Sequence, residues 1–131
     1  MPRHSVDLVR EIIEAARRGD WETALAGYDD DVILDQTRMP DGAFYRGRDG
    51  VAEFYGRWLG AWNELSITTR QLIHAGDQVV DINVVSGKGR DSGAPVRMQT
   101  ANVWTVENGR VVRQVGYLEP SEALEAVGHG A

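Results

Sequence analysis

The chain has 131 residues, with 14 Lys or Arg against 20 Asp or Glu, so its formal net charge is −6. This length suits one domain with its own core, and a hydrophobic content of 42% excludes a disordered chain. Without cysteine there is no disulfide framework, no thiolate metal site and no cysteine nucleophile. The acidic balance argues against a nucleic-acid partner, and no apolar run is long enough to span a membrane. Because the first residues lead into a charged amphipathic pattern instead of a signal peptide, we expect residues 1–131 to form a single cytoplasmic domain.

Helical periodicity appears first near the N-terminus. Residues 6–18 predict an amphipathic helix, and Asp20 is placed to cap a short second one. The third predicted helix, at 49–62, has the clearest pattern, a stripe at i, i+3, i+4, i+7, i+8 and i+11 formed by Val51, Phe54, Tyr55, Trp58, Leu59 and Trp62. A loop with Pro40 and Asp41 precedes it, and a short helix starting at Pro120 closes the chain.

The apolar period changes to two after the third helix, which is typical of strands. Four stretches rich in Val, Ile and Thr are separated by short turn sequences: 65–74, 78–87, 96–107 and 110–118. The Asn108-Gly109 pair between the last two is a strong hairpin signal. With an earlier strand at 32–37, the pattern predicts an α+β domain. Its mostly antiparallel sheet of five or six strands would wrap around the helix at 49–62 and leave a cavity at the open end.

The order of elements is accompanied by a set of turn and cap motifs. In chain order they are Ala16-Arg17-Arg18-Gly19-Asp20-Trp21, Tyr28-Asp29-Asp30-Asp31-Val32, Tyr45-Arg46-Gly47-Arg48-Asp49-Gly50-Val51, Val106-Glu107-Asn108-Gly109-Arg110-Val111-Val112, and Tyr117-Leu118-Glu119-Pro120-Ser121-Glu122-Ala123-Leu124. Over nearly the whole chain, this set resembles the nuclear transport factor 2-like superfamily, and within it the SnoaL-like and ketosteroid-isomerase-like group. The resemblance implies a cystatin-like cone with a cavity, and a homodimer. The fold hosts isomerases, cyclases, epoxide hydrolases and non-enzymes.

The catalytic positions of these families are occupied by other residue types here. By resemblance, the oxyanion tyrosine and aspartic acid of ketosteroid isomerases fall at Ile12 and Asn102, and the catalytic aspartate at Gln36. The Arg and two Asp of limonene epoxide hydrolases fall near Asn83, Val85 and Gly116. An amide is no general base near neutral pH, so Gln36 cannot replace an aspartate. Asn102 can still donate a hydrogen bond to a carbonyl oxygen.

Strand alternation sorts the remaining side chains by face. If Gln36 and Asn102 point into the cavity, the resemblance and the alternation predict a set of ligand-binding residues: Gln36, Asn83, Trp58, Trp62, Met98, Trp104 and Gln114. This apolar lining with several amides suits an uncharged, mostly hydrophobic small molecule with carbonyl or hydroxyl groups. The alternative for the aromatic residues is plain core packing, which is the more frequent role of such stripes.

Asp81 is the best candidate for a catalytic base. It lies in the middle of Val79-Val80-Asp81-Ile82-Asn83, where an unpaired charge would be costly. The alternative is a paired or strand-edge aspartate. Asp35 is predicted to point away from the cavity. No two histidines have the spacing of metal ligands, so neither a metal nor an organic cofactor is expected.

Two functions remain open. One is a cofactor-free proton-transfer enzyme (an isomerase, a cyclase or a hydrolase) that acts on a hydrophobic carbonyl compound, with Asp81 as base and Asn102 polarising the carbonyl. The other is a non-catalytic ligand-binding or dimerisation module. The outward sheet face is also expected to be apolar and to form the homodimer contact, through Ile82, Val84, Ala101, Val103, Val111, Val115 and Tyr117.

Overall fold

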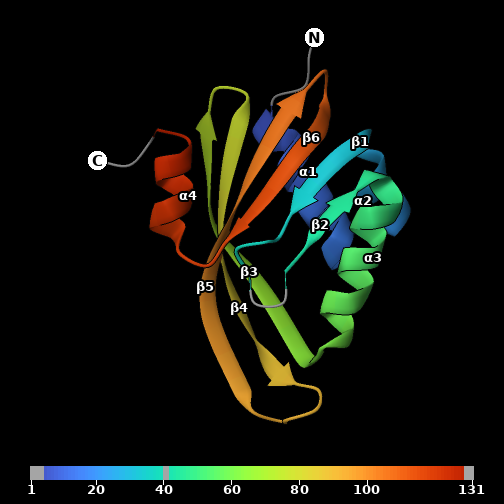
Figure 1. Ribbon diagram of the computed structural model, residues 1–131, viewed down its shortest axis with the longest axis vertical. Coiled ribbons are helices and arrows are strands. Elements are labelled where there is room, and N and C mark those ends of the chain that lie inside the picture. Colours follow the sequence, from blue (N-terminus) through green and yellow to red (C-terminus); the bar gives the residue numbers. More distant parts are fainter. Residues whose placement is uncertain (1–4, 40–41, 129–131) are drawn as a thin grey trace.

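The computed structural model describes residues 5–39 and 42–128; the expected turn at Pro40 and Asp41 lies outside them. Figure 1 shows the arrangement of the four helices and six strands found in this described part. In chain order they are α1 (Ser5–Arg17), α2 (Trp21–Ala26), β1 (Tyr28–Asp35), β2 (Phe44–Arg46), α3 (Gly47–Gly60), β3 (Trp62–Ala75), β4 (Gln78–Gly89), β5 (Pro95–Glu107), β6 (Arg110–Tyr117) and α4 (Pro120–Ala126). None of these helices is long and apolar enough to cross a membrane.

The strands form one sheet in the order β2-β1-β6-β5-β4-β3. Only the β1–β6 pair is parallel among the strands of the described residues. Asn108 and Gly109 both have positive φ, 52° and 75°, as a tight hairpin turn requires, and they join β5 to β6. The predicted α+β class and the mostly antiparallel curved sheet are therefore confirmed.

Several elements differ from the predicted ones in their bounds, and one was not predicted at all. β1 already begins at Tyr28, because its acidic residues lie on an exposed stretch and do not end the strand. The three-residue strand β2 is too short to show a period, and sequence reasoning missed it. The apolar stripe of α3 does not continue to Trp62, because the helix ends at Gly60 and Trp62 opens β3. At its other end, α3 begins at Gly47, two residues before the predicted start, with Arg46 as its N-cap and no side-chain hydrogen bond to cap it.

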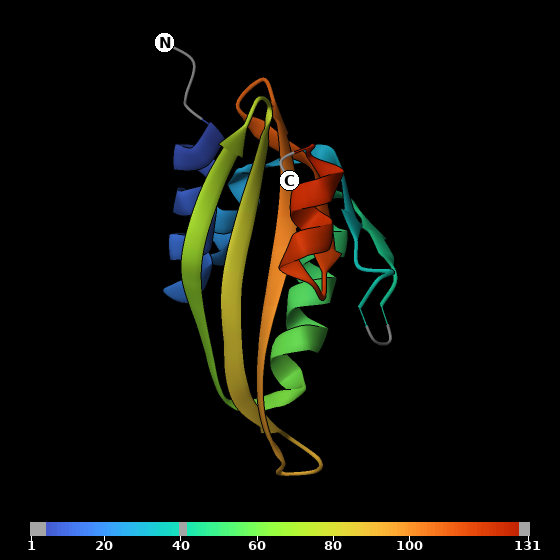
Figure 2. The same cartoon turned by 90° about the vertical axis from the view of Figure 1, so that its left-hand side faces the viewer.

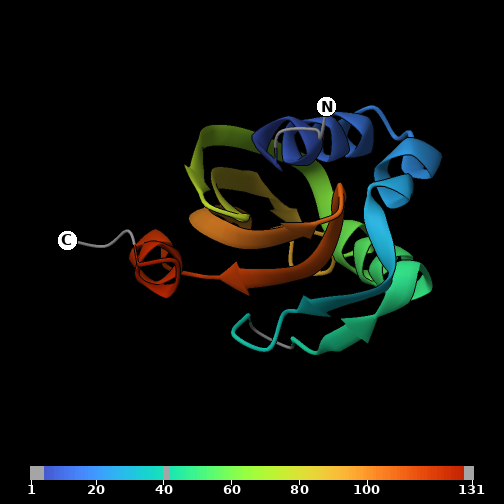
Figure 3. The ribbon, with the colours of Figure 1, turned by 90° about the horizontal axis from the view of Figure 1, so that it is seen from above.

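The sheet curves around α1 and α3, as the view from above shows (Figure 3). Its inner core joins buried residues of these helices to the inner strand faces: Leu8, Val9, Ile12, Ala15, Ala24, Tyr28, Val32, Leu34, Val51, Val79, Trp104, Val106 and Val111. This core closes one end of the cone. At the other end, the same inner face lines an open space.

The outer face of the sheet is covered by the C-terminal helix. Figure 2 shows α4 and α1 on opposite sides of the long strands. Ala123 of α4 is buried in a second core with Val80, Ile82, Ala101, Val103, Val115 and Tyr117. The expected apolar outer face thus exists, but α4 packs on it. Val111 was wrongly expected there and lies in the inner core, because the β5–β6 register shifts between Thr105 and Val106.

Candidate functional site

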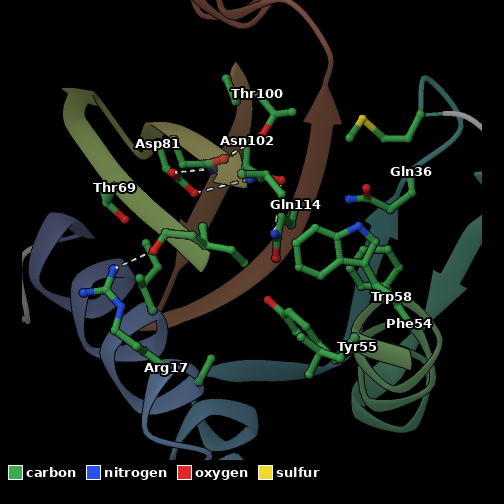
Figure 4. A pocket seen from close by; sticks show the side chains of 18 of the residues that line it. Arg17, Gln36, Phe54, Tyr55, Trp58, Thr69, Asp81, Thr100, Asn102 and Gln114 are labelled. Atoms are coloured by element: carbon green, nitrogen blue, oxygen red, sulfur yellow. Dashed lines mark hydrogen bonds between the residues drawn. The ribbon is translucent and has the colours of Figure 1, made fainter. Parts of the chain in front are cut away.

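A cavity of about 280 Å³ lies between the inner face of the sheet and the helices α1 and α3. It is lined by most of the residues that the sequence predicts for the site: Gln36, Trp58, Asp81, Asn83, Met98, Asn102, Trp104 and Gln114. Figure 4 shows Asp81, Asn102 and Gln114 side by side on the strands, facing Tyr55 and Trp58 of α3. The strand register explains this, since Asp81 pairs with Asn102, and Trp104 with Gln114.

Trp62 is the exception among the predicted ligand-binding residues. It is not part of the lining, because it belongs to β3 and no longer follows the helical stripe. Its ring lies edge-on to that of Trp58, with 6.1 Å between the centroids. Trp62 therefore packs against the lining residue Trp58 without lining the cavity itself.

Asp81 is 3% exposed and accepts three hydrogen bonds from neighbouring side chains. Asn83 Nδ2 donates to Oδ1 at 3.0 Å, while Asn102 Nδ2 and Trp104 Nε1 donate to Oδ2 at 3.3 and 3.2 Å. Thr100 in turn donates to Asn83 Oδ1 at 2.6 Å, which holds the Asn83 amide with its N–H groups toward Asp81. The carboxylate is fixed in position, and Oδ1 still has room for a further proton donor.

A second chain of hydrogen bonds also ends at Asp81. Tyr28 Oη donates to Gln114 Oε1 at 2.8 Å, and Gln114 Nε2 donates to Asn102 Oδ1 at 3.3 Å. Asn102 then donates to Asp81. Every donor in the chain points toward the carboxylate, so each bond polarises the next and favours a negative charge on Asp81.

The pKa of Asp81 reflects two opposing effects. Burial raises it above the usual value of 3.8, and the hydrogen bonds from Asn83, Trp104 and Asn102 lower it in part. The net direction is upward, which makes the carboxylate a stronger base than an exposed aspartate. The folded protein therefore gains stability from a protonated Asp81, and this gain is lost as the pH rises through the raised pKa.

A pair of tyrosines, Tyr28 of β1 and Tyr55 of α3, extends this network toward the helices. The hydroxyls of Tyr28 and Tyr55 are 3.3 Å apart. Tyr28 gives its one proton to Gln114, so Tyr55 is the donor to Tyr28. Burial raises the pKa of both phenols, which therefore stay protonated at neutral pH. Sequence reasoning missed both as site residues; the available signal was a hydroxyl among otherwise apolar residues, for Tyr55 within the apolar stripe of α3 and for Tyr28 at the start of β1.

Gln36 is buried at 4% exposure and follows the last residue of β1. Its side chain makes no hydrogen bond to any residue of 5–39 or 42–128, and it points into the cavity (Figure 4). It lies over Gly116, where a Cβ would come within 2.7 Å of Gln36 Oε1. The glycine thus leaves room for an amide whose donors and acceptor remain free for a ligand.

Asp35 lies outside the lining, as expected from alternation. It accepts hydrogen bonds from Thr37 and forms ion pairs with Arg38 at 3.4 Å and Arg113 at 3.6 Å. No group of three or more His, Asp or Glu side chains in the described residues is placed to hold a metal ion.

Comparison with known proteins places this architecture in a family. Residues 9–114 match the family described as SnoaL-like domain. A nuclear transport factor 2-like protein from Burkholderia thailandensis is 24% identical, with a TM-score of 0.82 over 95% of this chain and 97% of that one. A Catenulispora acidiphila protein with a ketosteroid isomerase-like fold is 17% identical, with a TM-score of 0.73 over 92% of both chains.

A third similar structure is a candidate polyketide cyclase from Xanthomonas campestris pv. campestris, which is 24% identical. Its TM-score is 0.68, over 94% of this chain and 96% of that one. No curated protein matches the chain significantly. At these identities the solved structures show the fold, and the family match covers most of the sequence. The chain belongs to the SnoaL-like domain family and has the nuclear transport factor 2-like, ketosteroid isomerase-like fold.

Proposed function

We propose that this protein binds a hydrophobic carbonyl compound in the cavity and transfers a proton on it, with Asp81 as general base. The observation that carries the proposal is the buried Asp81 carboxylate, which lines an otherwise mostly apolar cavity and has a raised pKa. Catalytic bases commonly show this combination of burial, cavity position and perturbed pKa. The similarity to a candidate polyketide cyclase agrees with this class of chemistry.

The step begins with a C–H bond next to the substrate carbonyl. Asp81 takes the proton, the C–H electrons form a C=C bond, and the carbonyl electrons move to oxygen to give an enolate. The proton then returns to the same carbon or to another one, which gives exchange or isomerisation. An enolate that attacks a second carbonyl of the same molecule would give a cyclised product. Proton transfer of this kind requires no redox cofactor.

Three donors are available for the developing oxyanion. Gln36 has a free amide, and Asn102 has a second N–H beyond the one that it gives to Asp81. Tyr55 donates to Tyr28 over 3.3 Å, a long hydrogen bond that it can exchange for a stronger one to an oxyanion. Neutral amide and phenol donors that are already in place stabilise charge without reorganisation.

A non-catalytic binding protein is the second candidate. Two features favour it. Both oxygens of Asp81 already accept hydrogen bonds. In addition, the position that resembles that of the catalytic aspartate of ketosteroid isomerases is occupied here by the amide of Gln36. The same cavity would then hold a carbonyl or hydroxyl ligand without turnover. The two candidates differ in one measurable property, the movement of a proton.

Deuterium exchange separates them. In D2O, wild-type protein should accelerate exchange at the acidic carbon of 2-tetralone above the buffer rate, as followed by proton NMR. Asp81→Asn should lose this acceleration by roughly 10²-fold or more, the usual contribution of a general base, while retaining binding. Asp77→Asn removes a carboxylate from the exposed β3–β4 turn and should behave as wild type.

Binding without any acceleration in the wild type would favour the second candidate. A thermal-shift screen with steroids, polyketide fragments, terpenoid epoxides and aromatic ketones extends the test to other ligands. If none of them stabilises the protein, the aromatic side chains fill the cavity as core, and both candidates fail.

A further inference from the structure

One cation lines the cavity. Arg17 is the last residue of α1, and its side chain reaches the space between this helix and β3. Its Nη2 donates to the backbone oxygen of Ile67 at 3.4 Å, which holds the guanidinium at the cavity and leaves other N–H groups unused. Among the described lining residues, Arg17 and Asp81 are the only charged ones.

The two charged side chains come from different elements, Arg17 from α1 and Asp81 from β4. Asp81 lies on the sheet next to Asn102, whereas Arg17 approaches from α1 at the helix side (Figure 4). An anionic group on a ligand would be attracted to Arg17 and repelled by Asp81, so it could bind in one orientation only. That orientation directs the remainder of the ligand toward Asp81.

A second hollow next to the cavity has the same sign of charge. It lies between α1 and β3 and shares Ile13, Arg17 and Thr69 with the cavity. Arg10 and Arg70 also line it, against one acidic residue, Glu14. Arg10 is neutralised in part by its ion pair with Asp7 at 3.3 Å, but the lining of this hollow still carries more positive than negative side chains, although the whole chain has a net charge of −6.

We propose that the ligand is a hydrophobic carboxylic acid whose carboxylate binds Arg17 while its carbonyl region lies at Asp81. The planar guanidinium matches a carboxylate better than a neutral amide or ester, which suits a single arginine at a cavity wall. This inference rests on the proposed function and adds the substrate class and a specificity-determining residue. A merely structural Arg17, acting on the C-terminal end of α1, would not distinguish an acid from its amide.

The test compares 1-naphthylacetic acid with 1-naphthylacetamide, which have nearly the same shape and differ in charge. Dissociation constants from titration calorimetry should show the acid binding roughly tenfold more tightly to the wild type, because charge-assisted hydrogen bonds exceed neutral ones. Arg17→Gln should abolish this preference and leave amide binding unchanged. Arg18→Gln removes the same charge from the adjacent residue, which pairs with Asp20, and should keep the preference.

Equal binding of acid and amide by the wild type would overturn the inference, and so would a preference that survives in Arg17→Gln or a failure of both probes to bind. The outcome is separable from that of the proposed function. Exchange on 2-tetralone without an acid preference supports Asp81 as the base and rejects the role of Arg17 in binding a carboxylate. An acid preference that depends on Arg17, without exchange on 2-tetralone, supports Arg17 as the carboxylate-binding residue and counts against Asp81 as the base.

Discussion

Two buried aspartates on opposite faces of the sheet show how surroundings determine the role of a residue. Asp35 is 4% exposed and Asp81 is 3% exposed, yet their pKa values move in opposite directions. Burial would raise the pKa of Asp35, but hydrogen bonds from Thr37 and the charges of Arg38 and Arg113 lower it overall. Asp81 has only neutral donors, so burial prevails. Asp35 therefore acts as an ionised partner of Thr37, Arg38 and Arg113, whereas Asp81 can take up a proton.

Gln36 allows stability and binding to be separated at a single residue. Gln36→Leu removes a buried amide that has no hydrogen-bond partner in the described chain, so the free energy of unfolding should stay unchanged or rise. A carbonyl ligand should lose a neutral hydrogen bond worth about 0.5–1.5 kcal/mol, which weakens binding about two- to twelvefold. Chemical denaturation and calorimetry with 2-tetralone check the two results. Clear destabilisation with unchanged affinity would show that Gln36 is structural.

Strand residues of the site could be predicted, and residues contributed by helices were harder to place. In a strand the side-chain direction alternates strictly, so the facing of Asp81, Asn102 and Gln114 follows from their positions. Tyr28 and Tyr55 meet only because β1 and α3 pack together, and no local pattern contains that contact. Trp62 shows the related difficulty, since a helical stripe does not reveal where the helix stops.

At the scale of elements, the length of a strand or helix determined whether it could be predicted from the sequence. The long period-two stretches correspond to β3 to β6, and Asn108-Gly109 correctly indicated their last hairpin. β2 has three residues, which is too few for any periodicity. The proline at the start of α4 was enough to predict this helix. The surface on which it packs, the outer face of the sheet, could not be predicted, because that contact joins residues far apart in the sequence. The expected apolar outer face therefore has an explanation within the chain itself.

The packing of α4 can be tested with a matched pair of substitutions. Ala123 is fully buried against the outer sheet, whereas Ala126 on the same helix is exposed. Ala123→Glu should lower the free energy of unfolding by about 2 kcal/mol or more, because it forces a charge into an apolar contact or undocks the helix. Ala126→Glu should change it by no more than about 0.5 kcal/mol. Urea denaturation that gives equal values for both variants would contradict the contact.

At the scale of the whole molecule, the curved sheet has two separately covered faces. The inner face carries the cavity, and the outer face carries α4. The homodimer that the resemblance implies stays a prediction, and most of the outer apolar residues first assigned to it are buried beneath α4. Sedimentation velocity at micromolar concentration would show a dimer if another surface provides the contact, and a monomer would contradict the expectation.

The pH dependence of deuterium exchange on 2-tetralone tests the central claim most directly. Only the ionised carboxylate of Asp81 accepts a proton, so the enzymatic rate should fall as the pH is lowered through its raised pKa. The account predicts a midpoint above 3.8, the usual value for an aspartate, and the loss of this pH-dependent rate in Asp81→Asn. A wild-type rate equal to the buffer rate at every pH, or the same profile in Asp81→Asn, would contradict the assignment of Asp81 as the base.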